Sequence, residues 1–268
     1  MGKVILIDNG IFQFRSIFAW RMNKKIPATW FYLASLIANL KKVGLNKEDK
    51  VIIAVDSKYG SWRKDIEKQY KANRKEFRKS FTDINWSQMF YDFNRLLNRL
   101  KYTTPFKVIA IRKLEADDII SASVRYFKDQ EVIIVSSDRD FEQLCSYSNV
   151  KIFSPKSKKY KIIKDPYKSL AQKIRREASD NLVNPVLNEK DYEERKMIVS
   201  LLSLPEWVEK KVIYKLSQLD FSNNLFNIQS IPFHTIQERM KTIYKKDKVV
   251  SYEKCLKKSK KKQRRKKK

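Results

Sequence analysis

The stretch VIIVSSDRD, residues 132–140, carries the pattern that decides the fold of this chain. Its apolar, β-branched run predicts a buried strand, and the run leads directly into Asp138 and Asp140. The same pattern occurs twice nearer the N-terminus, where VILI runs into Asp8 and VIIAV runs into Asp56. Three apolar runs that each lead into a carboxylate predict buried strands whose polar ends meet at one edge of a sheet.

Helical patterns lie between these runs, so that strands and helices alternate along the chain. Strands are predicted at residues 3–7, 50–55, 107–111, 131–136, 150–153 and 160–163. Apolar residues at helical spacing indicate helices at residues 28–43, 86–101, 115–127 and, for a short one, 139–145. This alternation is typical of an α/β fold with a largely parallel central sheet flanked by helices.

The pattern changes after residue 165, which we take as the end of the α/β core at residues 1–165. The region that follows, residues 166–248, is predicted to be wholly helical, with helices at about 166–178, 190–203, 206–218 and 233–245. Residues 249–268 are dominated by Lys and Arg and have no apolar face. Such a segment is expected to be a disordered cationic tail.

Composition points to a polyanionic partner and removes several catalytic chemistries. The 268 residues contain 59 Lys and Arg against 30 Asp and Glu, a formal net charge of +29, which favours nucleic acid as a partner. The single histidine, His234, argues against Ser-His, Cys-His and His-metal sites. The cysteines Cys145 and Cys255 lie far apart and fit a reducing compartment. Without a membrane-length apolar run or a visible leader, a cytoplasmic location is expected.

Seven acidic residues are predicted to gather at the carboxyl edge of the sheet, where parallel α/β folds bind their ligands. Four of them follow strands and three open the helix after the third strand: Asp8, Asp56, Asp138, Asp140, Glu115, Asp117 and Asp118. Crowded carboxylates repel one another, and Mg²⁺ or Mn²⁺ relieves that repulsion. Two such ions about 4 Å apart activate water and stabilise the leaving oxygen in phosphodiester hydrolysis.

Each of these acids also has a plain structural interpretation. Asp138 or Asp140 alone would serve as a cap or turn residue before the short helix at 139–145. Asp117 and Asp118 alone would complement the dipole of the helix that they open. The whole set at one edge favours metal binding over these separate roles.

A basic and aromatic segment follows Asp56, at about residues 58–82. Its aromatic rings include Tyr59, Trp62, Tyr70 and Phe77, and rings of this kind stack on unpaired bases. Its cations, which neutralise phosphates, include Arg63, Lys64, Lys68, Lys71, Arg74, Lys75 and Arg78. The alternative is a solvated helix face, but the position beside the acidic edge favours contact with a nucleic acid.

The pieces ILIDNG, IIAVDSKYGSWRKDIEKQYKANR, LEADDII and VIIVSSDRDFEQL, continued by NVKIFSPKSKKYKI, resemble the flap endonuclease and 5′→3′ exonuclease family. Within that family they are most similar to the ribonucleases H of T-even-type phages. Order, spacing and strand context agree over about residues 3–164. The resemblance implies a 5′-nuclease fold of the PIN-like kind, with a helical arch at about 58–82 through which a 5′ single strand passes.

The resemblance also implies roles for individual residues. One metal ion would be surrounded by Asp8, Asp56, Glu115 and Asp117, with Asp118 nearby, and a second by Asp138 and Asp140. The residues expected to approach the scissile phosphate are Arg63, Tyr70, Lys71 and Arg74. Of these, Lys71 and Arg74 are suited to stabilise charge on the phosphate in the transition state.

A further family motif, GDxxDN, matches the stretch REASDN at residues 176–181 only in part. Asp180 and Asn181 fit the motif, whereas Glu177 replaces its first Asp and Arg176 its Gly. The motif implies that Asp180 and Glu177 join the second metal site, directly or through water. An ordinary helix-end residue is the alternative for Asp180. The glycine-poor stretch that follows is shortened, so that lysines, including those of the tail, are expected to grip the duplex.

These observations predict a Mg²⁺-dependent 5′→3′ exonuclease and ribonuclease H, with flap endonuclease activity open, that removes RNA primers in phage DNA replication. Its expected partners are DNA and RNA–DNA hybrid with a 5′ end or flap, and a single-stranded DNA-binding protein of the replisome. Phage relatives carry an extension before the first strand for sliding-clamp binding, and no such segment is visible here. The alternatives are a PIN-like single-strand ribonuclease and a non-catalytic, structure-specific DNA-binding protein.

Overall fold

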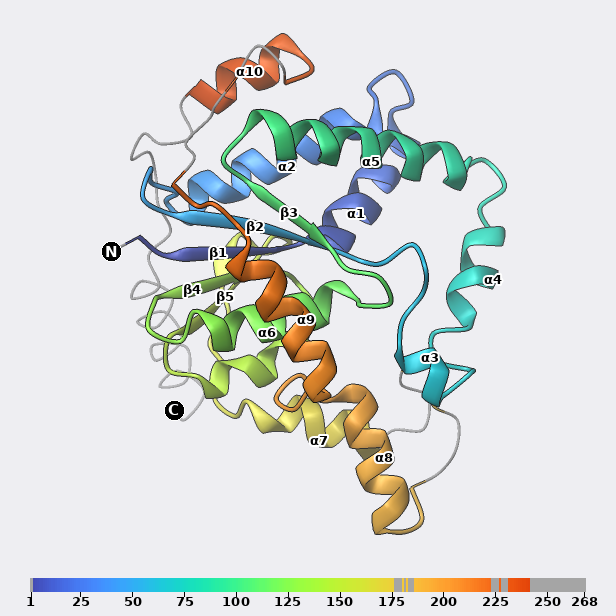
Figure 1. Ribbon diagram of the computed structural model, residues 1–268. Coiled ribbons are helices and arrows are strands. Elements are labelled where there is room, and N and C mark those ends of the chain that lie inside the picture. Colours follow the sequence, from blue (N-terminus) through green and yellow to red (C-terminus); the bar gives the residue numbers. More distant parts are fainter. Residues whose placement is uncertain are drawn as a thin grey trace, which may run out of the picture.

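A computed structural model of the protein describes residues 2–175, 180, 182, 186–222, 227 and 231–241. In this part of the chain one six-stranded sheet has the order β3-β2-β1-β4-β5-β6 (Figure 1). Its strands are β1 (Val4–Asp8), β2 (Lys50–Val55), β3 (Lys107–Ala110), β4 (Val132–Val135), β5 (Val150–Ser154) and β6 (Lys159–Tyr160). Strands β1 to β5 are parallel, and β6 is antiparallel to β5. The predicted fold class, with a largely parallel central sheet, is confirmed.

Helices cover both faces of this sheet because its central strands are apolar on both sides. In β1, Ile5 and Ile7 face one core while Val4 and Leu6 face the other, as the two-residue period of a strand requires. The first core is covered by α1 (Asn9–Met22), α2 (Ala28–Lys42), α5 (Trp86–Thr103) and α10 (His234–Lys241). The second is covered by α6 (Ala116–Tyr126), the 3₁₀ helix η1 (Asp140–Ser146) and α9 (Glu206–Ser217) (Figure 1).

Helix α1 was not predicted, and its composition explains why. Its buried side includes Asn9, Gln13 and Ser16 beside Phe12 and Ile17, so the apolar period of a helix is hidden. The polar side chains have internal partners: the Tyr32 hydroxyl donates to Asn9 Oδ1 at 2.8 Å, and Ser16 donates to the carbonyl of Phe12 at 2.6 Å. This helix follows β1 at once, and the position of Asp8 therefore depends on it.

The basic segment leaves the carboxyl end of β2 and forms two short helices, α3 (Arg63–Ile66) and α4 (Asn73–Lys79). They lie at one side of the molecule, beyond the strand ends, before the chain returns into α5 (Figure 1). Between them, Lys71 has a positive φ of 54°, which turns the chain back toward the sheet. This arrangement places the segment over the edge where the acidic residues gather.

Of the described C-terminal helices, α9 and α10 pack into the two cores of the sheet, whereas α7 and α8 form a small third core with Tyr70. Helix α7 (Tyr167–Arg175) packs against η1 and against α8 (Glu189–Val199). The α8 helix ends earlier than the predicted 190–203, because Ser200 is extended and Leu201 turns into the second core. Helix α9 packs on α6, and α10 packs on α2. The division at residue 165 into two units stays a prediction, and the tail at 249–268 lies outside the described residues.

Among the described helices, none has both the length and the apolar character that crossing a membrane would require.

Candidate active site at the carboxyl edge of the sheet

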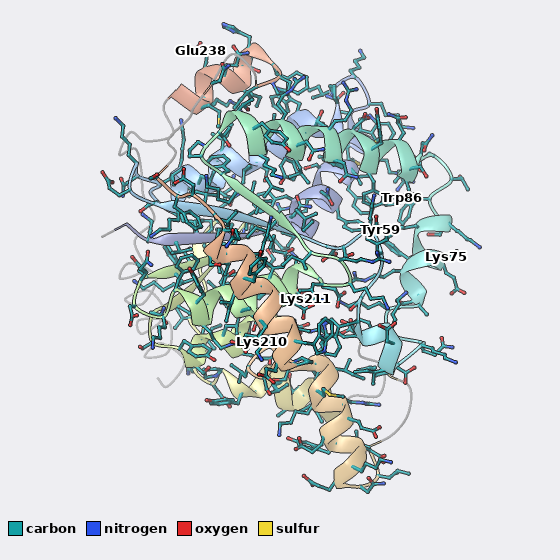
Figure 2. The ribbon with its side chains drawn as sticks, in the orientation of Figure 1. Tyr59, Lys75, Trp86, Lys210, Lys211 and Glu238 are labelled. Atoms are coloured by element: carbon teal, nitrogen blue, oxygen red, sulfur yellow. The ribbon has the colours of Figure 1, made fainter. Side chains whose placement is uncertain are left out.

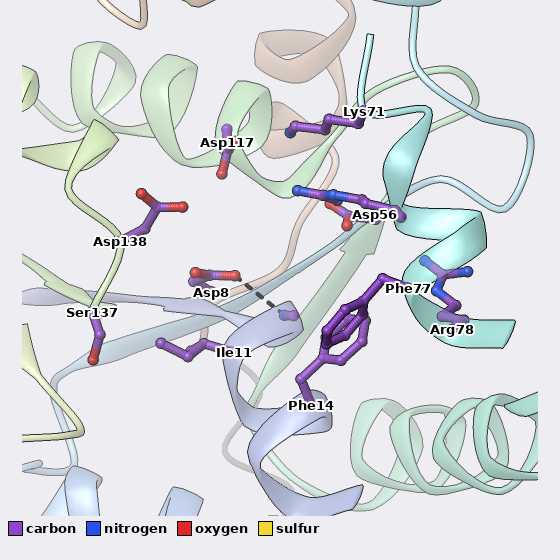
Figure 3. Close-up of a pocket in the computed structure, with 12 residues that line it drawn as sticks. Asp8, Ile11, Phe14, Asp56, Lys71, Phe77, Arg78, Asp117, Ser137 and Asp138 are labelled. Carbon is purple, nitrogen blue, oxygen red and sulfur yellow. Dashed lines mark hydrogen bonds between the residues drawn. The ribbon is translucent and has the colours of Figure 1, made fainter. Parts of the chain in front are cut away.

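Beyond the carboxyl ends of the strands lies an open pocket of about 430 Å³. Asp8, Asp56, Asp117 and Asp138 line it, and their side chains gather around one space, with the rings of Phe14 and Phe77 at its side (Figure 3). We call this pocket the acidic pocket, after its four aspartates. The other lining residues are Gly10, Ile11, Lys71, Arg74, Arg78 and Ser137.

Strand register explains how residues far apart in sequence meet in the acidic pocket. Because Ile7 pairs with Val135, Asp8 lies next to Ser136, whose hydroxyl donates to Asp8 Oδ2 at 2.7 Å. The other oxygen of Asp8 caps α1 by accepting from the Gly10 N–H at 3.2 Å. Asp56 follows β2 and accepts from the Ala116 N–H at 2.8 Å, which joins β2 to the start of α6.

Burial and neighbouring carboxylates disfavour the charged forms of Asp8 and Asp117 in the acidic pocket. Burial, together with the nearby Asp56 and Asp138, raises the pKa of Asp8 to about 6, although Ser136 opposes this rise. Burial also raises the pKa of Asp117 well above its ordinary value; Lys71 lowers it, and Asp138 raises it further. Among the described residues, no Lys or Arg forms a salt bridge with any of these four carboxylates.

This donor set fits a hard divalent cation in its chemistry, because oxygen ligands with unbalanced negative charge are what Mg²⁺ and Mn²⁺ prefer. In the described part of the chain, however, no three acidic, histidine or cysteine side chains stand so that they could hold a metal ion as placed. Rotation of the Asp side chains about their own bonds would therefore have to accompany binding. The attraction between a divalent cation and the unpaired carboxylates of the acidic pocket would drive this rotation.

Glu115 and Asp118, which the sequence grouped with the metal ligands, are bound to side chains of the basic segment. Asp118 is fully buried, with Arg63 Nη2 2.8 Å from its Oδ1 and the Trp62 indole N–H donating to its Oδ2 at 3.1 Å. Glu115 lies 3.0 Å from Arg63 Nη1 and 2.9 Å from Lys71 Nζ. Burial raises the pKa of Glu115, but Lys71 and Arg63 outweigh it and bring the pKa to about 2.

Two residues expected to contact nucleic acid are instead internal. Arg63 is 2% exposed, and its Nε donates to the carbonyl of Ile198 at 2.7 Å, so the predicted contact with the phosphate is wrong for this conformation. Tyr70 is 3% exposed, and its hydroxyl donates to Glu115 at 3.1 Å. Both residues fasten the basic segment to the sheet because a buried carboxylate needs such partners.

Most of the remaining cations of the basic segment line a second pocket, of about 560 Å³, that adjoins the first. Lys71, Arg74 and Arg78 line both pockets, and Lys64 and Lys75 line the second. Lys68 is exposed but does not line either pocket. Figure 2 shows Tyr59, Trp86 and Lys75 on the side of the molecule where α3 and α4 lie. We call this second pocket the basic cleft; it shares Lys71, Arg74 and Arg78 with the acidic pocket.

Asp140 and Asp180 form a third group with Lys173 of α7. The Lys173 ammonium contacts Asp140, and it lies 2.6 Å from Asp180 Oδ2. The sequence grouped Asp140 with Asp138 around one ion, but only Asp138 lines the acidic pocket. The two residues are still neighbours, because the Asp140 N–H donates to Asp138 Oδ1 at 3.0 Å. Glu177, the weaker candidate of the REASDN stretch, lies outside the described residues.

Sequence reasoning missed several residues of the site. Ser136 gave a signal only through its place between β4 and Asp138, and Phe14 belongs to the helix that was not predicted. Nothing in the sequence distinguished Lys173 from the other Lys and Arg residues, of which the chain has 59 in all.

Known proteins are similar to this chain in sequence and in fold. Residues 3–174 match the family model described as 5′-3′ exonuclease, N-terminal resolvase-like domain. Ribonuclease H of Enterobacteria phage T4 is 38% identical over 49% of this chain and 44% of its own length. A 5′-3′ exonuclease of Buchnera aphidicola is 26% identical over 93% of this chain and 84% of its own length. The chain thus spans less than half of the phage relative.

Solved structures show the same fold. The 5′-exonuclease of T5 with bound zinc superposes with a TM-score of 0.53 at 20% identity, over 90% of this chain and 97% of that one. The T5 flap endonuclease in a complex with DNA and metal ions has a TM-score of 0.54 at 18% identity, over 90% and 97%. The chain belongs to the 5′-3′ exonuclease family, as its strand-end aspartates and basic segment predicted.

Proposed function

We propose that this protein is a divalent-metal-dependent 5′→3′ exonuclease and ribonuclease H, with flap endonuclease activity, that removes RNA primers during phage DNA replication. The observation that carries the proposal is the acidic pocket itself, four carboxylates with unbalanced charge that open onto a cleft lined by cations. A polyanion drawn into the basic cleft would bring its phosphates to these carboxylates. The names of the T4 and Buchnera relatives support the reaction class.

Asp8, Asp56, Asp117 and Asp138 would hold Mg²⁺, with Mn²⁺ as a substitute. The chemistry that such an ion supplies is activation of water and neutralisation of charge on the phosphate. The sequence predicted two ions, but the Asp140–Asp180 pair is already matched by Lys173 and does not fit a second divalent ion as placed. Glu115 and Asp118, held by Arg63, would act by keeping the basic segment in place.

Lys71 and Arg74 would act on the substrate directly. Both line the acidic pocket, and the pKa of Lys71 is raised despite its burial, because Glu115 and Asp117 favour the ammonium form. A fixed ammonium and an exposed guanidinium at this position would stabilise the charge that develops on the phosphate. Lys64, Lys68, Lys75 and Arg78 would position the strand through its other phosphates.

The C-terminal part of the chain would contribute further affinity. We assign duplex binding to the helical region at 166–248 and to the basic tail at 249–268, whose charge suits a polyanion. Such an activity implies a single-stranded DNA-binding protein of the replisome as a partner. It also implies a location in the cytoplasm of a phage-infected host.

The test is a substrate panel in Mg²⁺ with an EDTA control. It comprises a 5′-labelled RNA–DNA hybrid, a 5′ flap, a nicked duplex and single-stranded RNA. Metal-dependent release of short products from the hybrid or the flap is the expected result. Cleavage of single-stranded RNA without need of a 5′ end would favour a PIN-like ribonuclease. Binding that survives EDTA, with no cleavage in any divalent metal, would leave a structure-specific DNA-binding protein.

A further inference from the structure

Lys173 is a buried lysine that the proposed reaction does not use. It lies on α7, its side chain is 14% exposed, and its ammonium contacts the carboxylates of both Asp140 and Asp180. The next residue, Ile174, is buried in a small core with Tyr70, Leu182 and others, so packing fixes the register of this helix. The position of the ammonium is therefore set by the fold.

Asp180 is held in place from two sides. Its backbone has a positive φ of 54°, and its carbonyl accepts from the Lys71 N–H at 2.8 Å, which ties it to the basic segment. Its carboxylate is turned to Lys173. Burial raises the pKa of Asp180, but Lys173 and then Lys71 outweigh it and lower the pKa below its ordinary value. This carboxylate is therefore already matched by positive charge.

Lys173 itself stays protonated in this environment. Burial lowers its pKa, but Asp140 and Asp180 raise it by more, so that the net direction is upward. A divalent ion between Asp140 and Asp180 would face the Lys173 ammonium at close range, and like charges there repel.

The acidic pocket offers the opposite environment. Its four carboxylates form no salt bridge within the described residues, and the nearest lysine of the basic segment, Lys71, is bound to Glu115 at 2.9 Å. Within the described residues, the carboxylates of the acidic pocket therefore have no ion pair of their own, whereas Asp140 and Asp180 already share one with Lys173. We propose that Lys173 takes the place of a second divalent ion at Asp140 and Asp180, so that this enzyme binds a single divalent ion, in the acidic pocket.

This proposal rests on the proposed metal-dependent nuclease, because it concerns the number of ions that the nuclease uses. It also assigns a role to Lys173: a positioning residue that holds Asp140 and Asp180 together while the basic segment remains fastened to Asp180. Removal of the ammonium would leave two carboxylates that repel each other and that a divalent ion would then bring together.

The experiment counts Mn²⁺ ions bound to the full chain without substrate, by electron paramagnetic resonance and by titration calorimetry. The expected count is one tight Mn²⁺ for the wild type, two for Lys173→Met, and one for Lys173→Arg, which keeps the charge. Lys168→Met, an exposed lysine of the same helix, is the matched control and should bind one. Crystals soaked in Mn²⁺ should show one anomalous peak in the acidic pocket and none between Asp140 and Asp180.

Two tight ions on the wild type would overturn the proposal, and so would a count of one on a folded Lys173→Met variant. No ion on the wild type would instead contradict the metal-dependent function itself, which separates the two failures. If Lys173→Met does not fold, Lys173→Gln supplies the second variant: it also removes the ammonium, and it should bind two ions. A count of one on a folded Lys173→Gln variant would contradict the role of Lys173.

Discussion

Asp8 and Glu115 stand at the same edge of the sheet, yet their pKa values move in opposite directions. Burial and neighbouring carboxylates raise that of Asp8 to about 6. Burial also acts on Glu115, but Lys71 and Arg63 lower its pKa to about 2. The difference lies in the partners that the basic segment supplies and not in the position on the fold. Residues of one edge thus divide into a site with unbalanced charge and a structural ion-pair group.

This comparison assigns different consequences to mutation of the two groups. The charged carboxylates of Asp8 and Asp117 are unfavourable in the metal-free protein, so the loss of either should cost catalysis and not stability. A member of the ion-pair group is buried with an opposite charge, so the loss of one partner should cost stability. The predictions below test this distinction, beginning with the largest effect.

Asp117→Asn should lower the cleavage rate by about 10³-fold, since a metal-held charge is worth several kcal/mol in the transition state. Binding of a 5′ flap in EDTA should be unchanged or tighter, because a negative charge next to the phosphate is removed. Urea unfolding should show no loss of stability. Single-turnover assays in Mg²⁺ measure the rate, with Asp129→Asn, an exposed residue after α6, as the control. A variant within a few-fold of wild type would remove Asp117 from the mechanism.

Arg63→Met should lower the free energy of unfolding by about 3–5 kcal/mol, because Glu115 and Asp118 would be left buried without their shared guanidinium. Urea denaturation followed by circular dichroism measures this change. Lys64→Met, the exposed neighbour in the same short helix, is the control and should change stability by less than about 0.5 kcal/mol. Unchanged stability with weakened DNA binding would restore Arg63 as a nucleic-acid contact.

The metal-free protein should become less stable as the pH rises from about 4 to 6. In this window folded Asp8 keeps a proton that the unfolded chain, with a pKa of 3.8, has released. The unfolding free energy should therefore fall by on the order of 3 kcal/mol as the pH passes through the folded pKa. Because Asp117 contributes a slope of the same sign, the measurement is the difference between wild type and Asp8→Asn in EDTA. If the unfolding free energies of the wild type and of Asp8→Asn depend on pH with the same slope, the pKa of Asp8 is not raised in the folded protein.

Glu115 should give the reverse dependence at lower pH. Its folded pKa is lowered, so its contribution to stability is complete above its ordinary pKa of 4.5 and is lost as the pH falls toward about 2. The variant Glu115→Gln should lose stability at pH 7 and lose little more on acidification. A wild-type curve that is flat below pH 4.5 would contradict the ion pairs with Lys71 and Arg63.

The strand ends explain how much of this could be predicted from sequence. The apolar runs before Asp8, Asp56 and Asp138 predicted the parallel sheet, and parallel strands bring their carboxyl ends to one edge whatever the details of packing. Helix α1 was missed because Asn9 and Gln13 interrupt its apolar face with buried polar groups. A local pattern shows which side chains are apolar, but it does not show which polar ones have partners.

The role of each charged residue could not be predicted for the same reason. Arg63 and Arg74 lie eleven residues apart in one basic segment, and nothing in their spacing separates them. The fold buries the first between Glu115 and Asp118 and leaves the second exposed at both pockets. Long-range pairing of this kind depends on the tertiary structure, as does the pairing of Lys173 with Asp140 and Asp180.

The smallest effect belongs to the outer cations of the basic cleft, which contact only phosphates in our proposal. Lys75→Ala should weaken flap binding by a few-fold at most and reduce the slope of log K against log salt by about 1, the release of one counterion. Fluorescence anisotropy over a salt series measures both quantities. Lys128→Ala, exposed after the end of α6 that lies farthest from the acidic edge, should leave the slope unchanged. Because Lys75 is exposed, its replacement should not change the free energy of unfolding. Equal salt slopes for the two variants would place the bound strand outside the basic cleft.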